Sequence, residues 1–293
     1  MIVYLNGDFI PLEDARISPL DRGFLFGDGV YEVIPAYNNQ LFRIEEHLQR
    51  LQNSLDAIRL NNPHDTATWV GIFNTLIDHQ DHHDHSIYLQ ITRGADNKRD
   101  HSIPDHLGPT IFIMSNAFPP QADIAKVSGV RVMTQTDSRW QHCNVKAITL
   151  LANILHRQDA IDNGYVETIL IRDGHALEGS ASNLFIVKDG IIKTPPKSPL
   201  LLPGITRDLV LEIAEQNNLP AQESDIALYE LLDADEVWIT SSTKEVVPVI
   251  QVDDKVIGDG QPGSVWKTMI TCFQEYKKQL NLVSLKKEST INL

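Results

Sequence analysis

The sequence predicts an α+β protein with two domains, and three observations carry this prediction. Apolar residues alternate with period two in some segments and recur with helical spacing in others, and the two kinds of segment follow one another in mixed order. The 293 residues are enough for two domains with sizeable cores. Phe118-Pro119-Pro120-Gln121 interrupts both patterns and indicates a linker. We therefore expect a small domain over residues 1–120, a larger one over residues 121–280, and a polar tail of the kind that is often disordered over residues 281–293.

The first part of the chain predicts a hairpin, a helix and two further strands. Asn6-Gly7-Asp8 joins residues 2–5 to residues 9–11, and Asn-Gly tolerates the positive φ that hairpin turns require. A helix is expected over residues 44–58, where one face is apolar. Strands are expected over residues 86–93 and 110–115.

The second part alternates strands with helices. The periodicity predicts a helix over residues 147–161 with Leu151, Ile154, Leu155 and Ile161 facing inward. Another helix is expected to begin at Thr206, a good N-cap residue, and a last helix precedes the tail. The remaining elements are strands at residues 130–136, 166–171 and 237–240 and hairpins across Asp189-Gly190 and Asp253-Asp254.

Composition and charge exclude several classes of protein. The formal net charge is −14, which argues against a general nucleic-acid binder because such proteins cluster Lys and Arg. Cys143 and Cys272 form no CxxC pair, which fits a reducing compartment. The first residues lack the features of a secretory signal, and no stretch approaches the ~18 apolar residues of a membrane span. We expect a cytoplasmic protein with small-molecule substrates and without nucleic-acid or membrane partners.

Lys146 is the residue with the clearest chemistry. It lies in Asn144-Val145-Lys146-Ala147-Ile148-Thr149-Leu150-Leu151, a lone ammonium in mostly apolar or uncharged surroundings. Partial desolvation favours the neutral amine, which can attack a carbonyl and form a Schiff base. Glu178-Gly179-Ser180-Ala181-Ser182-Asn183 and Leu202-Pro203-Gly204-Ile205-Thr206 follow further along. An amine, an acid and an anion-binding loop are together what pyridoxal phosphate requires.

The anion-binding loop has a physical basis. Gly204 lets the backbone approach a ligand, and the free N–H groups at the start of a helix favour a phosphate. The hydroxyl-rich run Ile239-Thr240-Ser241-Ser242-Thr243 and Arg50 are further candidates. Taken singly, the favoured interpretations of these three are a helix cap, a loop and a solvent-exposed arginine. Glu178 could keep a ring nitrogen protonated, or it could be a surface carboxylate near a turn.

Tyr31, Arg99 and His101 are candidates for the substrate side. Tyr31 follows Gly27-Asp28-Gly29-Val30, where the glycines suggest a tight approach before a strand; half-buried packing is the alternative. Arg99 and His101 are two apart in a loop and could hold a carboxylate, which arginine binds bidentately, or could belong to a solvated basic loop. The histidine-rich run at residues 78–85 lacks regular ligand spacing, so we expect a solvated loop there and no metal site.

Taken in order, these segments resemble the fold-type IV pyridoxal-phosphate enzymes, and among them most closely the D-amino acid aminotransferases. The resemblance extends over about residues 1–280. It is carried by residues 21–33, the Arg50 helix, Thr92-Arg93-Gly94 with Arg99-Asp100-His101, Lys146 and its helix, Glu178-Gly179-Ser180, residues 202–208 and residues 240–248.

The resemblance implies a fold, a cofactor and the residues that bind it. The implied fold is a small N-terminal α/β domain and a larger C-terminal pseudo-barrel α/β domain, and the implied cofactor is pyridoxal 5'-phosphate. Lys146 would be the Schiff-base lysine and Glu178 the partner of the pyridine nitrogen. The phosphate ligands would be Arg50, the backbone of Ile205 and Thr206, and Ser242.

The resemblance also implies an activity, which is transamination between a D-amino acid and a 2-oxo acid. Tyr31, Arg99 and His101 resemble the carboxylate trap of these enzymes, in which the last two would come from the neighbouring subunit of a homodimer. The alternatives of the same fold are a 4-amino-4-deoxychorismate lyase and a branched-chain aminotransferase. A binding or scaffolding protein with this fold would have lost Lys146 or Glu178, and both are present.

Overall fold

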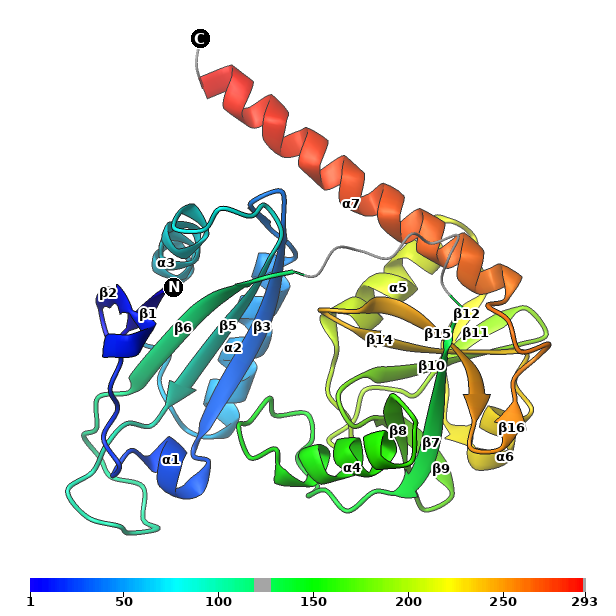
Figure 1. Ribbon diagram of the computed structural model, residues 1–293, viewed down its shortest axis with the longest axis horizontal. Helices are drawn as coiled ribbons and strands as arrows, with labels where there is room; N and C mark the ends of the chain where they lie inside the picture. Colours follow the sequence, from blue (N-terminus) through cyan, green and yellow to red (C-terminus); the bar gives the residue numbers. More distant parts are fainter. Residues whose placement is uncertain (119–127, 292–293) are drawn as a thin grey trace. The chain divides into compact units, whose positions relative to one another are not determined.

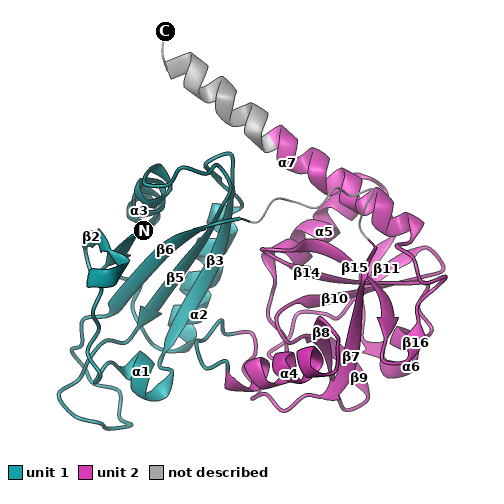
Figure 2. Cartoon of the chain, in the orientation of Figure 1, with its two compact units in different colours: residues 1–119, 145–150 teal, residues 120–144, 151–293 magenta. Residues whose placement is uncertain are grey.

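In a computed structural model of the protein, residues 1–118 and 128–291 are described, with side chains given as far as residue 279 (Figure 1). The chain forms two compact units (Figure 2). Unit 1 comprises Met1–Pro119 and Val145–Leu150, and unit 2 comprises Pro120–Asn144 and Leu151–Leu293. The predicted boundary at residue 120 lies outside the described residues. Lys146 therefore belongs to unit 1, although the chain enters unit 2 both before and after it.

Unit 1 is built on a six-stranded antiparallel sheet in the order β2-β1-β6-β5-β3-β4. Its strands are β1 (Ile2–Leu5), β2 (Asp8–Pro11), β3 (Gly29–Tyr37), β4 (Gln40–Leu41), β5 (His85–Thr92) and β6 (Thr110–Ala117). The helices are α1 (Arg22–Phe26), α2 (Ile44–Ala57) and α3 (Thr66–Asp78), and a 3₁₀ turn, η1, covers Leu12–Asp14.

The core of unit 1 lies between its sheet and helices α2 and α3. Leu51 and Leu55 of α2 are fully buried, as are Ile34 and Ile87 of the sheet. Burying each such side chain contributes about 1.5–3 kcal/mol, which fixes α2 on this face. Successive side chains of a strand alternate between faces, so Glu32 shares the helix-covered face of β3 with Val30 and Ile34.

Unit 2 is a closed barrel with helices outside it. The hydrogen-bonded strand path runs β10-β14-β15-β7-β8-β9 and returns to β10 through the pair Asn183–Glu178. The predicted pseudo-barrel is confirmed, since this closure leaves a barrel-like sheet. Its strands are β7 (Val130–Thr136), β8 (Glu167–Arg172), β9 (His175–Gly179), β10 (Asn183–Lys188), β11 (Ile191–Thr194), β12 (Ala221–Glu223), β13 (Ile226–Ala227), β14 (Glu236–Ser241), β15 (Glu245–Val252) and β16 (Lys255–Val256).

Four helices complete unit 2: α4 (Leu151–Asp162), α5 (Ile205–Gln216), α6 (Leu228–Leu232) and α7 (Ser264–Ile291). Helices α5 and α7 pack on each other and on β14. The backbone of α7 continues into the region of the predicted polar tail. Within the described part of the chain, no helix combines the length and apolarity needed to cross a bilayer.

Two local expectations were wrong. On α4, the predicted inward residues Leu151, Ile154, Leu155 and Ile161 are between 51% and 69% exposed, and the buried positions are His156 and Ala160. Periodicity identified the helix but not which face the barrel covers. Helix α5 is capped by Gly204 rather than by Thr206, which lies within the first turn.

Candidate active site

Lys146 is held against strand β3 of unit 1 through both of its backbone groups. Its carbonyl accepts a hydrogen bond from the Tyr31 N–H at 2.9 Å, and its N–H donates to Ser54 Oγ of α2 at 3.2 Å. Ala147 bridges to Val30 in the same strand-like run. Lys146 Nζ lies 4.2 Å from the centre of the Tyr31 ring. The structure thus brings together two predicted site residues that are 115 positions apart in the sequence.

Arg50 is a buried arginine paired with a buried glutamate. Its Nε and Nη2 donate to the two carboxylate oxygens of Glu32 at 2.8 and 2.7 Å. His47 Nδ1 lies 2.9 Å from Glu32 Oε2. Burial favours the neutral form of Glu32, but the charge and hydrogen bonds of Arg50 outweigh it and hold the pKa of Glu32 below its usual range. Burial lowers the pKa of His47, and the nearby charges of Arg50 and Lys146 lower it further.

Arg99 and His101 lie in the exposed loop between β5 and β6 of unit 1. The Arg99 guanidinium carbon is 5.0 Å from the centre of the Phe26 ring, and the His101 ring centre is 5.3 Å from it. The structure therefore brings these two predicted residues together on one aromatic side chain.

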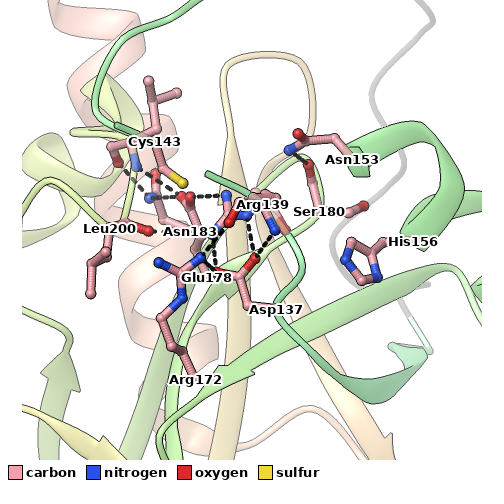
Figure 3. Close-up of polar contacts among 12 residues, drawn as sticks. Asp137, Arg139, Cys143, Asn153, His156, Arg172, Glu178, Ser180, Asn183 and Leu200 are labelled. Carbon is pink, nitrogen blue, oxygen red and sulfur yellow. Dashed lines mark hydrogen bonds and ion pairs between the residues drawn. The ribbon is translucent and has the colours of Figure 1, made fainter. Parts of the chain in front are cut away.

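Glu178 lies where the barrel of unit 2 closes. It is buried at the end of β9, paired in register with Asn183 of β10. Arg139 Nη1 donates to Glu178 Oε1 at 2.5 Å, while Asn183 Nδ2 and the Leu202 N–H donate to Oε2 at 3.2 and 3.1 Å (Figure 3). Burial raises the pKa of Glu178 to about 7, although the charge and hydrogen bond of Arg139 lower it. The carboxyl group can consequently exchange a proton near neutral pH.

The charge of Arg139 is shared between two acids. Its Nε and Nη2 also donate to the two carboxylate oxygens of Asp137 at 2.9 and 3.0 Å. Arg172 forms a further ion pair with Asp137 at 2.9 Å. The close-up in Figure 3 shows these side chains converging on Glu178 from the strand end of β7 and from β8. The negative charge of Asp137 is one of the causes that raise the pKa of Glu178.

The start of helix α5, where the sequence predicts an anion site, has no side-chain cap. Gly204 is the N-cap and supplies no side-chain acceptor, so no side chain caps the first turn containing Ile205 and Thr206. A Cβ on Gly204 would come within 1.9 Å of Asn183 Oδ1, so a larger residue there would force the Asn183 side chain to shift. Asn183 pairs in register with Thr240, whose buried Oγ1 has no hydrogen-bond partner among the described residues.

Ser242 lies in the turn that joins β14 to β15, two residues after Thr240. The turn is anchored by Glu245, which accepts hydrogen bonds from Gln274 Nε2 and Lys277 Nζ of α7. Glu245 has a φ of 57°, a left-handed conformation that costs a β-carbon-bearing residue about 1 kcal/mol or more, and these contacts hold it. The hydroxyl-rich turn is therefore fixed in place by the C-terminal helix.

Several residues of the site were not found by sequence reasoning. Glu32 lies in the segment of residues 21–33 and His47 in the predicted helix over residues 44–58. Both are buried polar residues, on β3 and on α2, and this is a signal that could have identified them. Asp137 and Arg139 carry no motif and reach Glu178 only because β7, which they follow, is joined to β9 through β8. Among the described residues, no group of three or more His, Cys, Asp or Glu side chains is arranged for a metal ion.

These residues fit pyridoxal phosphate. A phosphate needs several donors, and within unit 2 the first turn of α5 and the Thr240 hydroxyl without a described partner are donors. A pyridine nitrogen needs an acid that titrates near it, which Glu178 provides. An aldehyde needs an amine, which Lys146 carries.

Comparison with known proteins agrees with this chemistry. The class IV aminotransferase family matches residues 29–252. The D-alanine aminotransferase of Bacillus licheniformis is 39% identical over 94% of this chain and 96% of that protein, and that of Listeria monocytogenes (serotype 1/2a, strain 10403S) is 36% identical over 94% and 96%. The branched-chain amino acid aminotransferase of Escherichia coli superposes with a TM-score of 0.85 at 26% identity, over 93% of this chain and 92% of that one. The family predicted from the order of the motifs is thus confirmed, and the chain belongs to the class IV aminotransferases, a family of pyridoxal-phosphate enzymes.

Proposed function

We propose that this enzyme transfers the amino group of a D-amino acid to a 2-oxo acid. The observation that carries the proposal is Lys146, whose amine lies on the Tyr31 ring while both backbone groups of the residue are fixed by β3 and α2. The near-full-length similarity to D-alanine aminotransferases supports a D-amino acid as the donor.

We assign cofactor binding to six residues. Lys146 would hold pyridoxal phosphate covalently, and Glu178 would bind its ring nitrogen. When bound, the cofactor supplies an electron sink for the electron pair left at the substrate Cα. The assigned phosphate donors are Arg50, the backbone N–H groups of Ile205 and Thr206, and Ser242.

Lys146 is the base in this proposal. When the substrate is bound, the amine of Lys146 would take the proton from the substrate Cα at Nζ and later release it for the second proton transfer of the reaction. The positive charge of Lys146 is one of the causes that lower the pKa of the buried His47, so the amine lies close to the group formed by His47, Glu32 and Arg50. A positioned base typically contributes about 10²–10⁴-fold to the rate.

Glu178 and Arg139 act on the proton of the ring nitrogen. With a pKa of about 7, Glu178 can accept or share that proton. The charge and hydrogen bond of Arg139 keep the Glu178 carboxyl partly ionised despite its burial. The hydrogen bonds from Asn183 and the Leu202 N–H fix the carboxylate plane, so that the proton is held in one direction.

Tyr31, Arg99 and His101 would bind the substrate carboxylate. Arg99 and His101 supply two donors, and among the described contacts of Arg99 none is with a carboxylate, so its charge is available for a substrate anion. Holding the carboxylate determines which face of the substrate Cα is presented to the base, and hence which enantiomer reacts.

A substrate comparison tests the proposed function. D-alanine, L-leucine and 4-amino-4-deoxychorismate are offered singly as donor, with 2-oxoglutarate as acceptor, and oxo-acid formation is measured. We expect turnover with D-alanine at least ~10²-fold above the other two. A substrate whose carboxylate does not reach Arg99 and His101 leaves these donors without a partner, and the site rejects it strongly. Preferential turnover of L-leucine would instead favour the branched-chain alternative, and release of pyruvate from aminodeoxychorismate the lyase.

We also propose that the active form is a homodimer in the cytoplasm. Helix α4 exposes Leu151, Ile154, Leu155 and Ile161, an apolar stripe that a second copy of the chain would cover. The two free cysteines fit a reducing compartment. Leu155→Asp should convert a dimer to monomer in light scattering, whereas Val256→Asp, at an exposed position of β16, should not. A wild-type protein that is monomeric at micromolar concentration would contradict the dimer.

A further inference from the structure

The aromatic ring of Phe26 contacts three cationic or titratable side chains of unit 1. The guanidinium carbons of Arg22 and Arg99 lie 4.9 and 5.0 Å from its ring centre, and the His101 ring centre lies 5.3 Å from it at an interplanar angle of 42°. We call these four residues the Phe26 cluster. Guanidinium groups at such distances from an aromatic ring are attracted to its electron-rich face.

The ring of Phe26 is itself fixed. It is the last residue of α1, and Gly27 ends that helix with a φ of 68°, where an added Cβ would come within 2.4 Å of Thr149 Cγ2. At the other end of α1, Asp21 caps the helix by accepting from the Gly23 N–H at 2.8 Å and accepts a second bond from Thr110 Oγ1. A short helix tied at both ends gives Phe26 a defined position.

Arg22 holds the loop from its buried side. Its Nη1 donates to the carbonyl of Asp100 at 2.7 Å, and its Nε donates to Asp28 at 2.8 Å, while Arg22 itself is only 4% exposed. Asp100 is the residue between Arg99 and His101. The central carbonyl is therefore bound by a buried arginine, and the side chains on either side of it both contact Phe26.

The charges of the cluster are unequally compensated. Asp28 pairs with Arg22 and with Arg93, and these two arginines outweigh burial to lower the pKa of Asp28. The described residues give Arg99 an aromatic ring as its contact and no acid. Arg22 thus has an acidic partner in Asp28, whereas the guanidinium of Arg99 can pair with an anion that comes from outside the chain.

We propose that Phe26 is a positioning residue that sets the substrate specificity of the enzyme, by holding Arg99 and His101 as a pair that binds the α-carboxylate. This inference rests on the proposed function. Arg99 and His101 are otherwise exposed and would sample many rotamers, at a cost of about 0.5–1.5 kcal/mol for each side chain that binding must order. Phe26 removes part of that cost before the substrate arrives.

The test compares Phe26→Leu with Phe26→Tyr. Leucine keeps apolar bulk without a π face, and tyrosine keeps the face. Phe26→Leu should raise the KM for D-alanine about tenfold with little change in kcat, as expected from the loss of cation–π contacts of this size. Phe26→Tyr should restore KM. Phe24→Leu, a change of the same kind on α1 at a 71% exposed position, is the control and should match wild type. Cofactor affinity and Tm, measured on all four proteins, should not differ.

A binding measurement separates this inference from the proposed function. Propionate, which has the carboxylate of alanine without its amine, is titrated into the holoenzyme while the ring-proton signal of His101 is followed, with the signal assigned by its loss in His101→Gln. Propionate should shift the signal saturably in wild type and Phe26→Tyr, and about tenfold more weakly in Phe26→Leu. An unresponsive wild-type signal, or equal affinity in Phe26→Leu, would overturn the inference. Absence of D-alanine turnover by wild type would overturn the proposed function and leave propionate binding to decide the role of Phe26.

Discussion

Each unit contains a buried glutamate paired with a buried arginine, and the two pairs have opposite pKa shifts. Glu32 in unit 1 has a pKa below its usual range, whereas Glu178 in unit 2 has one raised to about 7. Both glutamates are buried, so burial alone cannot explain the difference. The difference lies in how strongly each arginine stabilises the ionised carboxylate of its glutamate.

Arg50 directs two hydrogen bonds to the two oxygens of Glu32. Arg139 directs two hydrogen bonds to Asp137 and one to Glu178, and Asp137 adds a negative charge nearby. The first pair fixes a charge; the second leaves a carboxyl that can take up a proton. Identical residue types can thus serve as an electrostatic anchor or as an acid, depending on a third neighbour.

The largest expected effect concerns Lys146, because the roles proposed for the Glu32–Arg50 and Glu178–Arg139 pairs depend on its amine. Lys146→Ala should lower turnover by at least about 10²–10⁴-fold, because the reaction loses its base. Stopped-flow or steady-state assays with D-alanine measure this, and Lys255→Ala, at an exposed position of β16, is the matched control. Full turnover by Lys146→Ala would remove the basis for assigning chemistry to either pair.

The next effect separates the two glutamates. Glu178→Gln should lower kcat by about 10²-fold without unfolding the protein, because glutamine cannot hold the proton on the ring nitrogen. Glu32→Gln should instead lower the free energy of unfolding by about 3–5 kcal/mol, since it leaves Arg50 buried without its anionic partner. Denaturant unfolding and kcat are measured on both variants, and the same profile in both would show that the pairs do not differ in role.

The pH dependence of stability gives a sharper contrast. The pKa of Glu178 rises from 4.5 to about 7 on folding, so in the protein without cofactor its contribution to unfolding free energy should fall as pH rises through this window, by at most about 3 kcal/mol. The pKa of Glu32 is lowered, so its contribution is lost as pH falls below about 4.5. Urea unfolding at pH 4–8 should show a decline that Glu178→Gln removes. An unchanged decline in that variant would assign it to other groups.

The smallest expected effect tests the third neighbour itself. Asp137→Asn removes a negative charge beside Glu178 and frees the charge of Arg139, so the pKa of Glu178 should move down from about 7, by about one unit. Carboxyl ¹³C shifts of labelled glutamate, titrated with pH, measure it, and Asp189→Asn at an exposed hairpin is the control. A pKa that stays near 7 would mean that burial alone sets the value.

The chemistry of the site was more predictable from the sequence than its electrostatics. Lys146 and Glu178 stand in segments whose local composition is unusual, so they could be selected without a structure. Arg139 stands in an ordinary loop after β7, and only the pairing of β7 with β8 and of β8 with β9 brings it to Glu178. The assigned roles of Lys146 and Glu178, like those of the phosphate donors Arg50, Ile205, Thr206 and Ser242, stay predictions until cofactor binding is measured.

The faces of helices were the least predictable feature. The apolar spacing of α4 indicated a helix correctly, but its apolar stripe is exposed and His156 is buried against the barrel. His156 is accommodated by hydrogen bonds to Gln135 and Ser138. Apolar periodicity predicts that one face of a helix will be buried. It does not predict whether that face is buried by the same chain or by a partner.

Residue types and their spacing along one chain were enough to predict the family, the alternation of elements and the reactive amine. Three features became evident only in the folded chain: which of two buried glutamates stays ionised, the contact of Phe26 with Arg99 and His101, and the closeness of Gly204 to Asn183. The two kinds of property differ in range. Propensity and periodicity act over a few residues, whereas desolvation, ion pairing and steric fit depend on groups that only folding brings within a few ångströms.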